Sequence, residues 1–285
     1  DLADIVCGHV ALVRGGHEYD GRPLVPFDED ATVSAARRMR ELGTTSVGVT
    51  AVFSPLTSEC EERAAEILRA EIPGVSVTLS HDLGRIGLLE RENAVLLNAS
   101  LVSLARRTNK AFRTAVEESG LDAPLFLTQN DGTVMRAEQA EAFPVYSFAS
   151  GPTNSMRGAA FLLEIKDAMV VDVGGTTTDV GHLKAGFPRE ANRVVEVGGV
   201  RTLFRMPDLL SLGLGGGTLV DVDARTVGPR SVGYRLTSEA LVFGGGSLTA
   251  TDVAVRAGMV AGIGDASLVS RLDAGVAAWF AHEVR

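Results

Sequence analysis

The acid-bracketed turn between Asp172 and Asp179 is the part of this sequence best suited to chemistry. An apolar strand leads into it, the run GGTTT (174–178) forms the turn, and a second strand leads out. Because glycine has no Cβ, backbone N–H groups of such a turn can approach an anion closely. The two carboxylates could hold Mg²⁺ through water or orient an attacking water. A plain β-hairpin would need the glycines but neither two acids nor three threonines, so the pattern favours phosphate binding. The residues predicted to cradle the phosphate are Gly174, Gly175, Thr176 and Thr177.

A glycine triplet, Gly215, Gly216 and Gly217, stands between two apolar segments further along the chain. Such a run lets the backbone lie against a flat ligand or against a neighbouring helix. It does not complete the pattern G-x-G-x-x-G, since Thr218 stands where the last glycine is needed, and a Rossmann dinucleotide site is therefore disfavoured. The later triplet at 244–246 is interpreted as loop.

A third candidate is the segment Ser150-Gly151-Pro152, which precedes a predicted helix. The first turn of a helix offers unpaired N–H groups and a partial positive charge, and both suit phosphate or carboxylate. A capped helix with proline in its first turn explains the same residues. The sequence leaves both interpretations open.

Composition and missing motifs exclude several classes of function. The net charge is −9 and there is no basic block, which argues against nucleic acid or an anionic membrane as partner. There is no Walker motif G-x-x-x-x-G-K-[ST] and no G-x-S-x-G nucleophile elbow. The five histidines show no metal-ligand spacing. Two cysteines, Cys7 and Cys60, make no disulfide framework, and no apolar stretch approaches the roughly 20 residues of a membrane span. We therefore expect a cytoplasmic protein.

Strands and helices are predicted to alternate, which is the pattern of an α/β layer. The helix predicted at 28–42 opens on acids and stops at Gly43. The helix predicted at 58–70 begins with Ser58 and Glu61 in capping-box positions. Further helices are expected at 88–119, 152–165, 249–260 and 266–285, and strands at 47–53, 75–79, 125–128, 168–173 and 179–184.

Several longer stretches, taken together, are specific to one family. They are GRPLVPFDED (21–30), AVFSPLTSECEERAAEIL (51–68), LSHDLGRIGLLERENAVLLNASL (79–101), LTQNDGTV (127–134), ASGPTNSMRGAAFL (149–162), VVDVGGTTTDVGHL (170–183) and LLSLGLGGGTLVDVD (209–223). With these residues the chain resembles the hydantoinase/oxoprolinase family, the HyuA-type subunits, over nearly its whole length. That family belongs to the sugar-kinase/Hsp70/actin superfamily.

The resemblance implies an α/β fold with two ribonuclease-H-like, actin-like ATPase lobes, in which mixed sheets are flanked by helices and ATP lies in the cleft. Residues 1–87 would be the later part of the first lobe, and residues 88–285 the second lobe. The hairpin would be the second phosphate motif, with Asp172 and Asp179 as catalytic residues and Mg²⁺ ligands. Residues 215–217 would be the adenosine motif, and Ser150 and Gly151 would join the nucleotide site.

The activity implied by the resemblance is ATP-dependent ring opening of a cyclic amide, such as a hydantoin or 5-oxoproline, through phosphorylation of a carbonyl oxygen. One alternative is the ATP-binding subunit of an acetone/acetophenone-type carboxylase, and another is a non-catalytic nucleotide-binding or assembly module. The cofactors would be ATP and Mg²⁺. A HyuB-type companion subunit is the expected partner, a homo-oligomer is left open, and neither nucleic acid nor a membrane is expected.

Two departures from the family pattern limit these expectations. The family's first Asp-Gly-Gly-Thr hairpin has no copy in this chain, which opens with Asp1. We therefore expect a segment of a longer protein, with weak nucleotide binding and no turnover by these 285 residues alone. Many members also carry a Pro-Gly-Pro-Ala-Cys-Tyr-Gly segment, whereas this chain runs Arg230–Leu236 (RSVGYRL) without the cysteine. No role of that cysteine transfers to this chain.

Overall fold

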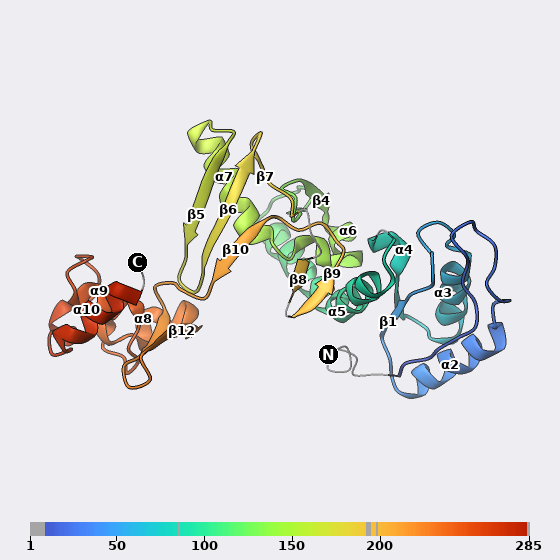
Figure 1. Ribbon diagram of the computed structural model, residues 1–285, viewed down its shortest axis with the longest axis horizontal. Coiled ribbons are helices and arrows are strands. Elements are labelled where there is room, and N and C mark those ends of the chain that lie inside the picture. Colours follow the sequence, from blue (N-terminus) through green and yellow to red (C-terminus); the bar gives the residue numbers. More distant parts are fainter. Residues whose placement is uncertain (1–8, 85, 192–194, 198, 284–285) are drawn as a thin grey trace. The chain divides into compact units, whose positions relative to one another are not determined.

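The computed structural model describes residues 9–84, 86–191, 195–197 and 199–283 (Figure 1). The chain divides into two compact units. Unit 1 comprises Asp1–Arg157 and Phe187–Asp208, and unit 2 comprises Gly158–Gly186 and Leu209–Arg285. None of the described helices is both long enough and apolar enough to cross a bilayer. The Cys60 thiol is free, and Cys7 lies outside the described residues.

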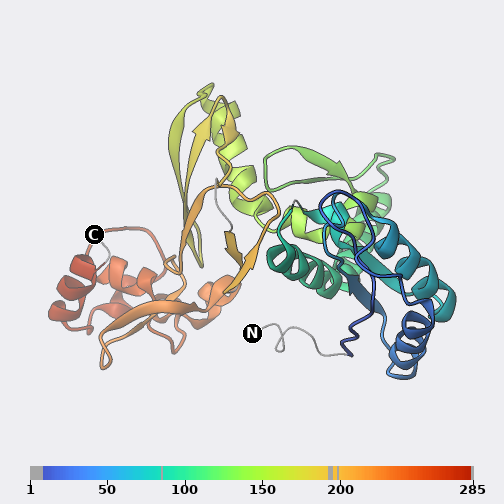
Figure 2. The same cartoon turned by 45° about the vertical axis from the view of Figure 1, so that its right-hand side comes forward.

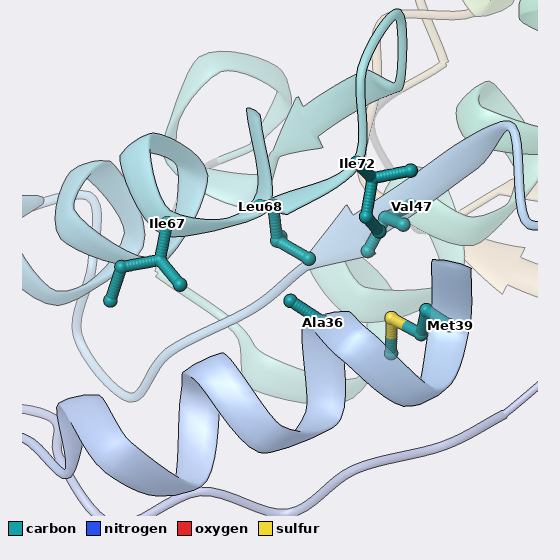
Figure 3. Packing of buried hydrophobic residues seen from close by; sticks show 6 residues of the cluster. All are labelled: Ala36, Met39, Val47, Ile67, Leu68 and Ile72. Carbon is teal, nitrogen blue, oxygen red and sulfur yellow. The ribbon is translucent and has the colours of Figure 1, made fainter. Parts of the chain in front are cut away.

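Unit 1 begins with two helices packed beside a pair of parallel strands. The elements are α2 (Glu29–Glu41), β1 (Ser46–Val49), α3 (Glu59–Glu71) and β2 (Ser76–Leu79). The Asp28 side chain accepts a hydrogen bond from the Ala31 N–H and caps α2, as its sequence predicts. The expected strand at 47–53 ends earlier, because residues after Val49 turn toward α3. Figure 3 shows the core between these elements, formed by Ala36, Met39, Val47, Ile67, Leu68 and Ile72.

The long helix α5 (Leu88–Glu118) organises the rest of unit 1. It packs directly on β1, since a Cβ built on Gly48 would lie 2.5 Å from Val95 Cγ1. The helix is unbroken from Leu88 to Glu118, and Gly120, just beyond its C-cap Ser119, adopts φ +73°. The other elements of unit 1 are α4 (Ser80–Leu83), β3 (Phe126–Thr128), β4 (Val134–Arg136), α6 (Ala137–Ala142), η1 (Pro144–Ser147), β7 (Phe187–Pro188), β8 (Val195–Val197) and β9 (Val200–Thr202).

The capping box predicted at the start of α3 is wrong. Ser58 makes no side-chain capping bond, and the Glu61 carboxylate does not reach back to the helix end. Glu61 is fully buried and accepts from the Ala51 N–H at 2.8 Å instead. The Glu61 carboxylate therefore accepts hydrogen bonds from residues outside α3, although the local sequence pattern predicted that it would cap the helix.

Unit 2 holds three antiparallel strands of a four-stranded sheet, in the order β10-β6-β5 (Figure 2). Its strands are β5 (Ala168–Val173), β6 (Thr178–Lys184) and β10 (Leu209–Leu212). α7 (Ser150–Leu163) contributes residues to both units and begins two residues before the predicted Pro152. The remaining elements are β11 (Thr218–Asp221), β12 (Thr226–Ser231), η2 (Gly233–Arg235), α8 (Leu236–Glu239), η3 (Leu241–Phe243), α9 (Ala250–Arg256), η4 (Ala266–Val269) and α10 (Ala274–Glu283).

Two helix predictions in unit 2 need correction. The helix expected at 249–260 is shorter, because α9 ends at Arg256 and Gly258 adopts φ +71°. The helix expected at 266–285 is interrupted: a 3₁₀ turn precedes α10, whose first turn follows Asp273. Residues 284–285 of that prediction lie outside the described residues. The triplet at 244–246 lies in a loop, as expected.

Candidate functional site

The hairpin between β5 and β6 forms as the sequence predicts. Val173 pairs with Thr178, and the Gly174 N–H donates to the Thr177 carbonyl at 2.9 Å, which closes the turn. The N–H groups of Gly175 and Thr176 have no acceptor within the described residues, and both residues are exposed. Consecutive free N–H groups in a tight turn are the geometry of an anion-binding concavity.

Asp172 and Asp179 face each other across the ladder. Directly opposed residues on antiparallel strands have their side chains on the same face, and like charges there repel. The Asp179 carboxylate accepts from the Ser211 hydroxyl through Oδ1 and from Thr177 Oγ1 through Oδ2, the latter at 3.2 Å. Asp172 has no hydrogen-bond partner among the described residues.

The donor set of this carboxylate pair suits an Mg²⁺ ion that keeps most of its water ligands. The described residues contain no group of three or more His, Cys, Asp or Glu that could hold a metal. Mg²⁺, however, keeps several waters and is commonly bound by one or two carboxylates together with substrate phosphates. Two opposed carboxylates beside free N–H groups match that donor set, and a cation there would relieve the repulsion between Asp172 and Asp179.

The glycine triplet lies against the backbone of the hairpin. The Gly216 N–H donates to the Gly174 carbonyl at 3.1 Å, and the Gly217 N–H donates to the Gly175 carbonyl at 2.7 Å. A Cβ on Gly215 would come within 2.6 Å of the Thr176 nitrogen. The sequence predicted contact with a flat ligand or with a neighbouring helix. The triplet contacts the hairpin turn, which was not predicted, and also α9, whose Thr251 N–H donates to the Gly216 carbonyl at 3.0 Å. The nucleoside role of the triplet stays a prediction.

Two hydroxyl side chains hold this arrangement: Thr178, one of the threonines of the predicted turn, and Thr251, which the sequence did not single out. Thr251 Oγ1 donates to the Gly216 carbonyl at 2.8 Å, and the Thr251 N–H reaches the same oxygen at 3.0 Å. Thr178 Oγ1 donates to the Leu214 carbonyl at 2.7 Å. Ser and Thr are common everywhere, so only the strand register, which brings distant residues to the triplet, distinguishes these from other hydroxyls.

Ser150 and Gly151 lie in the first turn of α7 and belong to unit 1, whereas the hairpin and the triplet belong to unit 2. The turn before them is fixed by Asn130, whose Oδ1 accepts from the Ala149 N–H at 2.9 Å. Asn130 also donates to the Val145 carbonyl at 2.9 Å. These bonds give a structural reason for the segment, and its role in the nucleotide site stays a prediction.

Sequence reasoning also missed a buried polar network in unit 1. Glu61 accepts from the Ser80 hydroxyl, and its other oxygen lies 2.8 Å from His81 Nδ1. Arg91 Nε donates to Ser80 Oγ at 2.7 Å, and burial lowers the pKa of this guanidinium while the Glu61 charge opposes that shift. Burial also disfavours the charged form of the nearby Asp82 carboxyl, and therefore raises its pKa. The network joins the ends of β1 and β2 to α3 and α5. Its two buried charged side chains, Glu61 and Arg91, are both hydrogen-bonded to Ser80 Oγ, which offsets part of the cost of burying them.

Comparison with known proteins places these features in context. A model of the family described as hydantoinase/oxoprolinase matches residues 91–262, and a model of the hydantoinase/oxoprolinase N-terminal region matches residues 4–72. The chain is 27% identical over 268 residues to the caprolactamase subunit alpha of Pseudomonas jessenii, a match covering 90% of this chain and 38% of that protein. It is 26% identical over 270 residues to the acetophenone carboxylase gamma subunit of Aromatoleum aromaticum, covering 90% of this chain and 36% of that protein.

Two solved structures have the same fold. Nucleotide-free acetone carboxylase, studied for ATP-dependent acetone carboxylation, gives a TM-score of 0.74 at 21% identity and covers 95% of this chain and 42% of its own. The ATP-dependent caprolactamase of Pseudomonas jessenii gives a TM-score of 0.70 at 22% identity, with the same coverage of 95% and 42%. The predicted α/β fold of the actin-like ATPase type is confirmed. The chain spans less than half the length of each of these relatives. Since the longer family match takes in more than half of the chain, including the hairpin and the glycine triplet, the chain belongs to the hydantoinase/oxoprolinase family.

Proposed function

We propose that this chain is the ATP-binding part of an enzyme that opens a cyclic amide by phosphorylating its carbonyl oxygen. The observation that carries the proposal is the hairpin, in which free N–H groups and two opposed carboxylates meet at one turn. A 27% identical relative is a caprolactamase subunit, and a lactam is a cyclic amide. Hydantoins and 5-oxoproline belong to the same chemical class.

Each residue of the hairpin has a role in this proposal. The N–H groups of Gly175 and Thr176 bind phosphate oxygens, with Gly174 and Thr177 closing the turn around them. Asp172 and Asp179 hold Mg²⁺ through its waters, and either carboxylate can orient an attacking water. Bound MgATP would supply a phosphoryl group that makes a poor electrophile reactive. The triplet at 215–217 flanks the nucleoside.

A carboxylase subunit is the second candidate, in which the same hairpin would serve phosphorylation of a ketone-derived enol. It is favoured by the 26% identity to an acetophenone carboxylase gamma subunit, which nearly equals the identity to the caprolactamase subunit. Both relatives are named as subunits, and this supports a companion subunit of the HyuB type for either activity. Turnover with lactams, hydantoins and 5-oxoproline, compared with ketones plus bicarbonate, separates the two candidates.

Isothermal titration of the 285-residue chain with MgATP tests nucleotide binding. We expect weak binding that Asp172→Ala abolishes, because the mutation removes one carboxylate of the cation site. Asp223→Ala, an exposed acid in the turn between β11 and β12, is the matched control and should bind like the wild type. Binding that survives Asp172→Ala, or that is equally lost in Asp223→Ala, would count against the hairpin as the nucleotide site.

A further inference from the structure

We propose that Ser211 is a positioning residue that holds the Asp179 carboxylate in place for the cation. This inference rests on the proposed function of the hairpin. Ser211 lies on β10 directly opposite Asp179, and Asp179 lies directly opposite Asp172. The three side chains thus form one row across the strands β10, β6 and β5, on one face of the sheet.

The two carboxylates of this row are held differently. Ser211 Oγ donates to Oδ1 of Asp179, and Thr177 Oγ1 donates to Oδ2 at 3.2 Å. Asp172 has no comparable donor among the described residues. A carboxylate has about four acceptor positions, so Asp179 can accept both hydroxyls and still accept the water of a hydrated cation. Asp179 is therefore the fixed carboxylate of the pair, and Asp172 is free to adjust.

A fixed carboxylate matters because its neighbour has the same charge. Without the Ser211 hydroxyl, repulsion from Asp172 favours rotamers that turn Asp179 away from the shared face. The cation would then have to restore the binding rotamer, and that ordering weakens the observed affinity. With the Ser211 hydroxyl present, Asp179 already holds the binding rotamer before the cation arrives.

The position of Ser211 does not depend on its own hydroxyl. β10 is held to β6 by its ladder from Leu209 to Leu212, and the Thr178 hydroxyl bonds the Leu214 carbonyl at 2.7 Å just beyond it. Ser211 is exposed, so its replacement by alanine leaves no buried cavity. Ser211→Ala should therefore delete the hydroxyl while the strand stays in register.

The first measurement is Mn²⁺ binding in the presence of ADP, followed by the EPR signal of free Mn²⁺. We expect Ser211→Ala to raise the dissociation constant of Mn²⁺ about three- to tenfold, the range of a typical net hydrogen bond, because this hydroxyl is exposed and water can partly replace it. Ser211→Thr retains the hydroxyl and should stay within about twofold of the wild type. Ser270→Ala is the control, because that hydroxyl donates only to the Ser267 carbonyl at 2.6 Å within its own turn.

The second measurement needs neither metal nor nucleotide. In protein labelled with ¹³C at aspartate, the carboxylate signal of Asp179, identified by its loss in Asp179→Asn, should move in Ser211→Ala but not in Ser211→Thr or Ser270→Ala. A signal that stays in place in Ser211→Ala overturns the inference, as does unchanged Mn²⁺ affinity in Ser211→Ala when Asp172→Ala loses Mn²⁺. A wild-type chain that takes up no Mn²⁺ with ADP contradicts the proposed function itself, and the NMR result then still decides whether Ser211 holds the carboxylate.

Discussion

Gly215 occupies a position where one added methyl group would collide with the hairpin between β5 and β6. A Cβ there would lie 2.6 Å from the Thr176 nitrogen and 2.7 Å from the Gly174 carbonyl oxygen. Both are backbone atoms, which cannot turn aside as a side chain can. We expect Gly215→Ala to displace the turn, to cost about 1–3 kcal/mol of unfolding free energy, and to abolish MgATP binding. Urea unfolding and calorimetric titration measure the two effects.

Gly246→Ala is the matched control, because a Cβ on Gly246 meets nothing within 4 Å and its φ is not in the left-handed region. This variant should unfold and bind like the wild type. If Gly215→Ala bound MgATP normally, the triplet would not be the support that keeps the hairpin in its binding conformation.

At the level of single residues, the sequence predicted the hairpin, but it did not predict the hydroxyl groups that hold it in place. Asp172 and Asp179 could be found because two acids that bracket a glycine-rich turn are unusual in a plain hairpin, and residue type is visible in sequence. Ser211 and Thr251 could not be found, since a hydroxyl residue acquires its role only from the strand register and loop path that bring it to its partner. The Asp172–Asp179 repulsion likewise becomes visible only once the two acids are known to be paired.

Two helix starts show when a local pattern suffices. Thr249 accepts from the Asp252 N–H, and the Asp252 carboxylate accepts from the Thr249 N–H at 2.7 Å, which makes a capping box for α9. Ser58, in the same relation to Glu61, makes no such bond. We expect Thr249→Ala to lower the unfolding free energy by about 1–2 kcal/mol and Ser58→Ala to change it by less than about 0.5 kcal/mol.

Chemical unfolding of the two variants against the wild type measures these differences. Comparable losses in both would mean that Ser58 caps α3 after all. The contrast has a physical cause: Asp252 is buried within its own turn, also accepting from the Val242 N–H at 2.7 Å, whereas Glu61 is drawn into the network around Ser80. Tertiary contacts therefore decide whether a capping pattern is used, and the sequence of one helix start cannot contain that information.

Element types were otherwise predictable where the periodicity was long. α2 and α5 appear close to their predicted bounds, since many residues repeat the same apolar face. Short elements were less predictable: β1 ends at Val49, and the last predicted helix is divided before α10. In both places a short turn ends the element, although the flanking residues favour continuing the strand or the helix.

At the scale of the whole molecule, the chain forms two compact units, each with its own core. Their limits differ in kind from the predicted lobes at 1–87 and 88–285, because unit 1 includes both β1 and the helix α5 that packs on it. The assignment of those two ranges to two lobes stays a prediction. The alternation of strand and helix patterns in the sequence indicates which elements form. The compact unit to which an element belongs depends on contacts between residues far apart in sequence.

Separate cores should respond separately to damage. Met39 lies in the core of unit 1 and is 9% exposed, and Val253 lies in a core of unit 2 and is 1% exposed. Truncation of either to alanine removes buried apolar contacts and should cost about 1–4 kcal/mol. Because each core is built from residues of one unit, we expect Met39→Ala to speed amide hydrogen exchange in peptides of unit 1 and Val253→Ala in those of unit 2. Mass spectrometry of exchanged, digested protein resolves the two. Faster exchange throughout the chain in either variant would contradict this expectation, because it would mean that the two units unfold together.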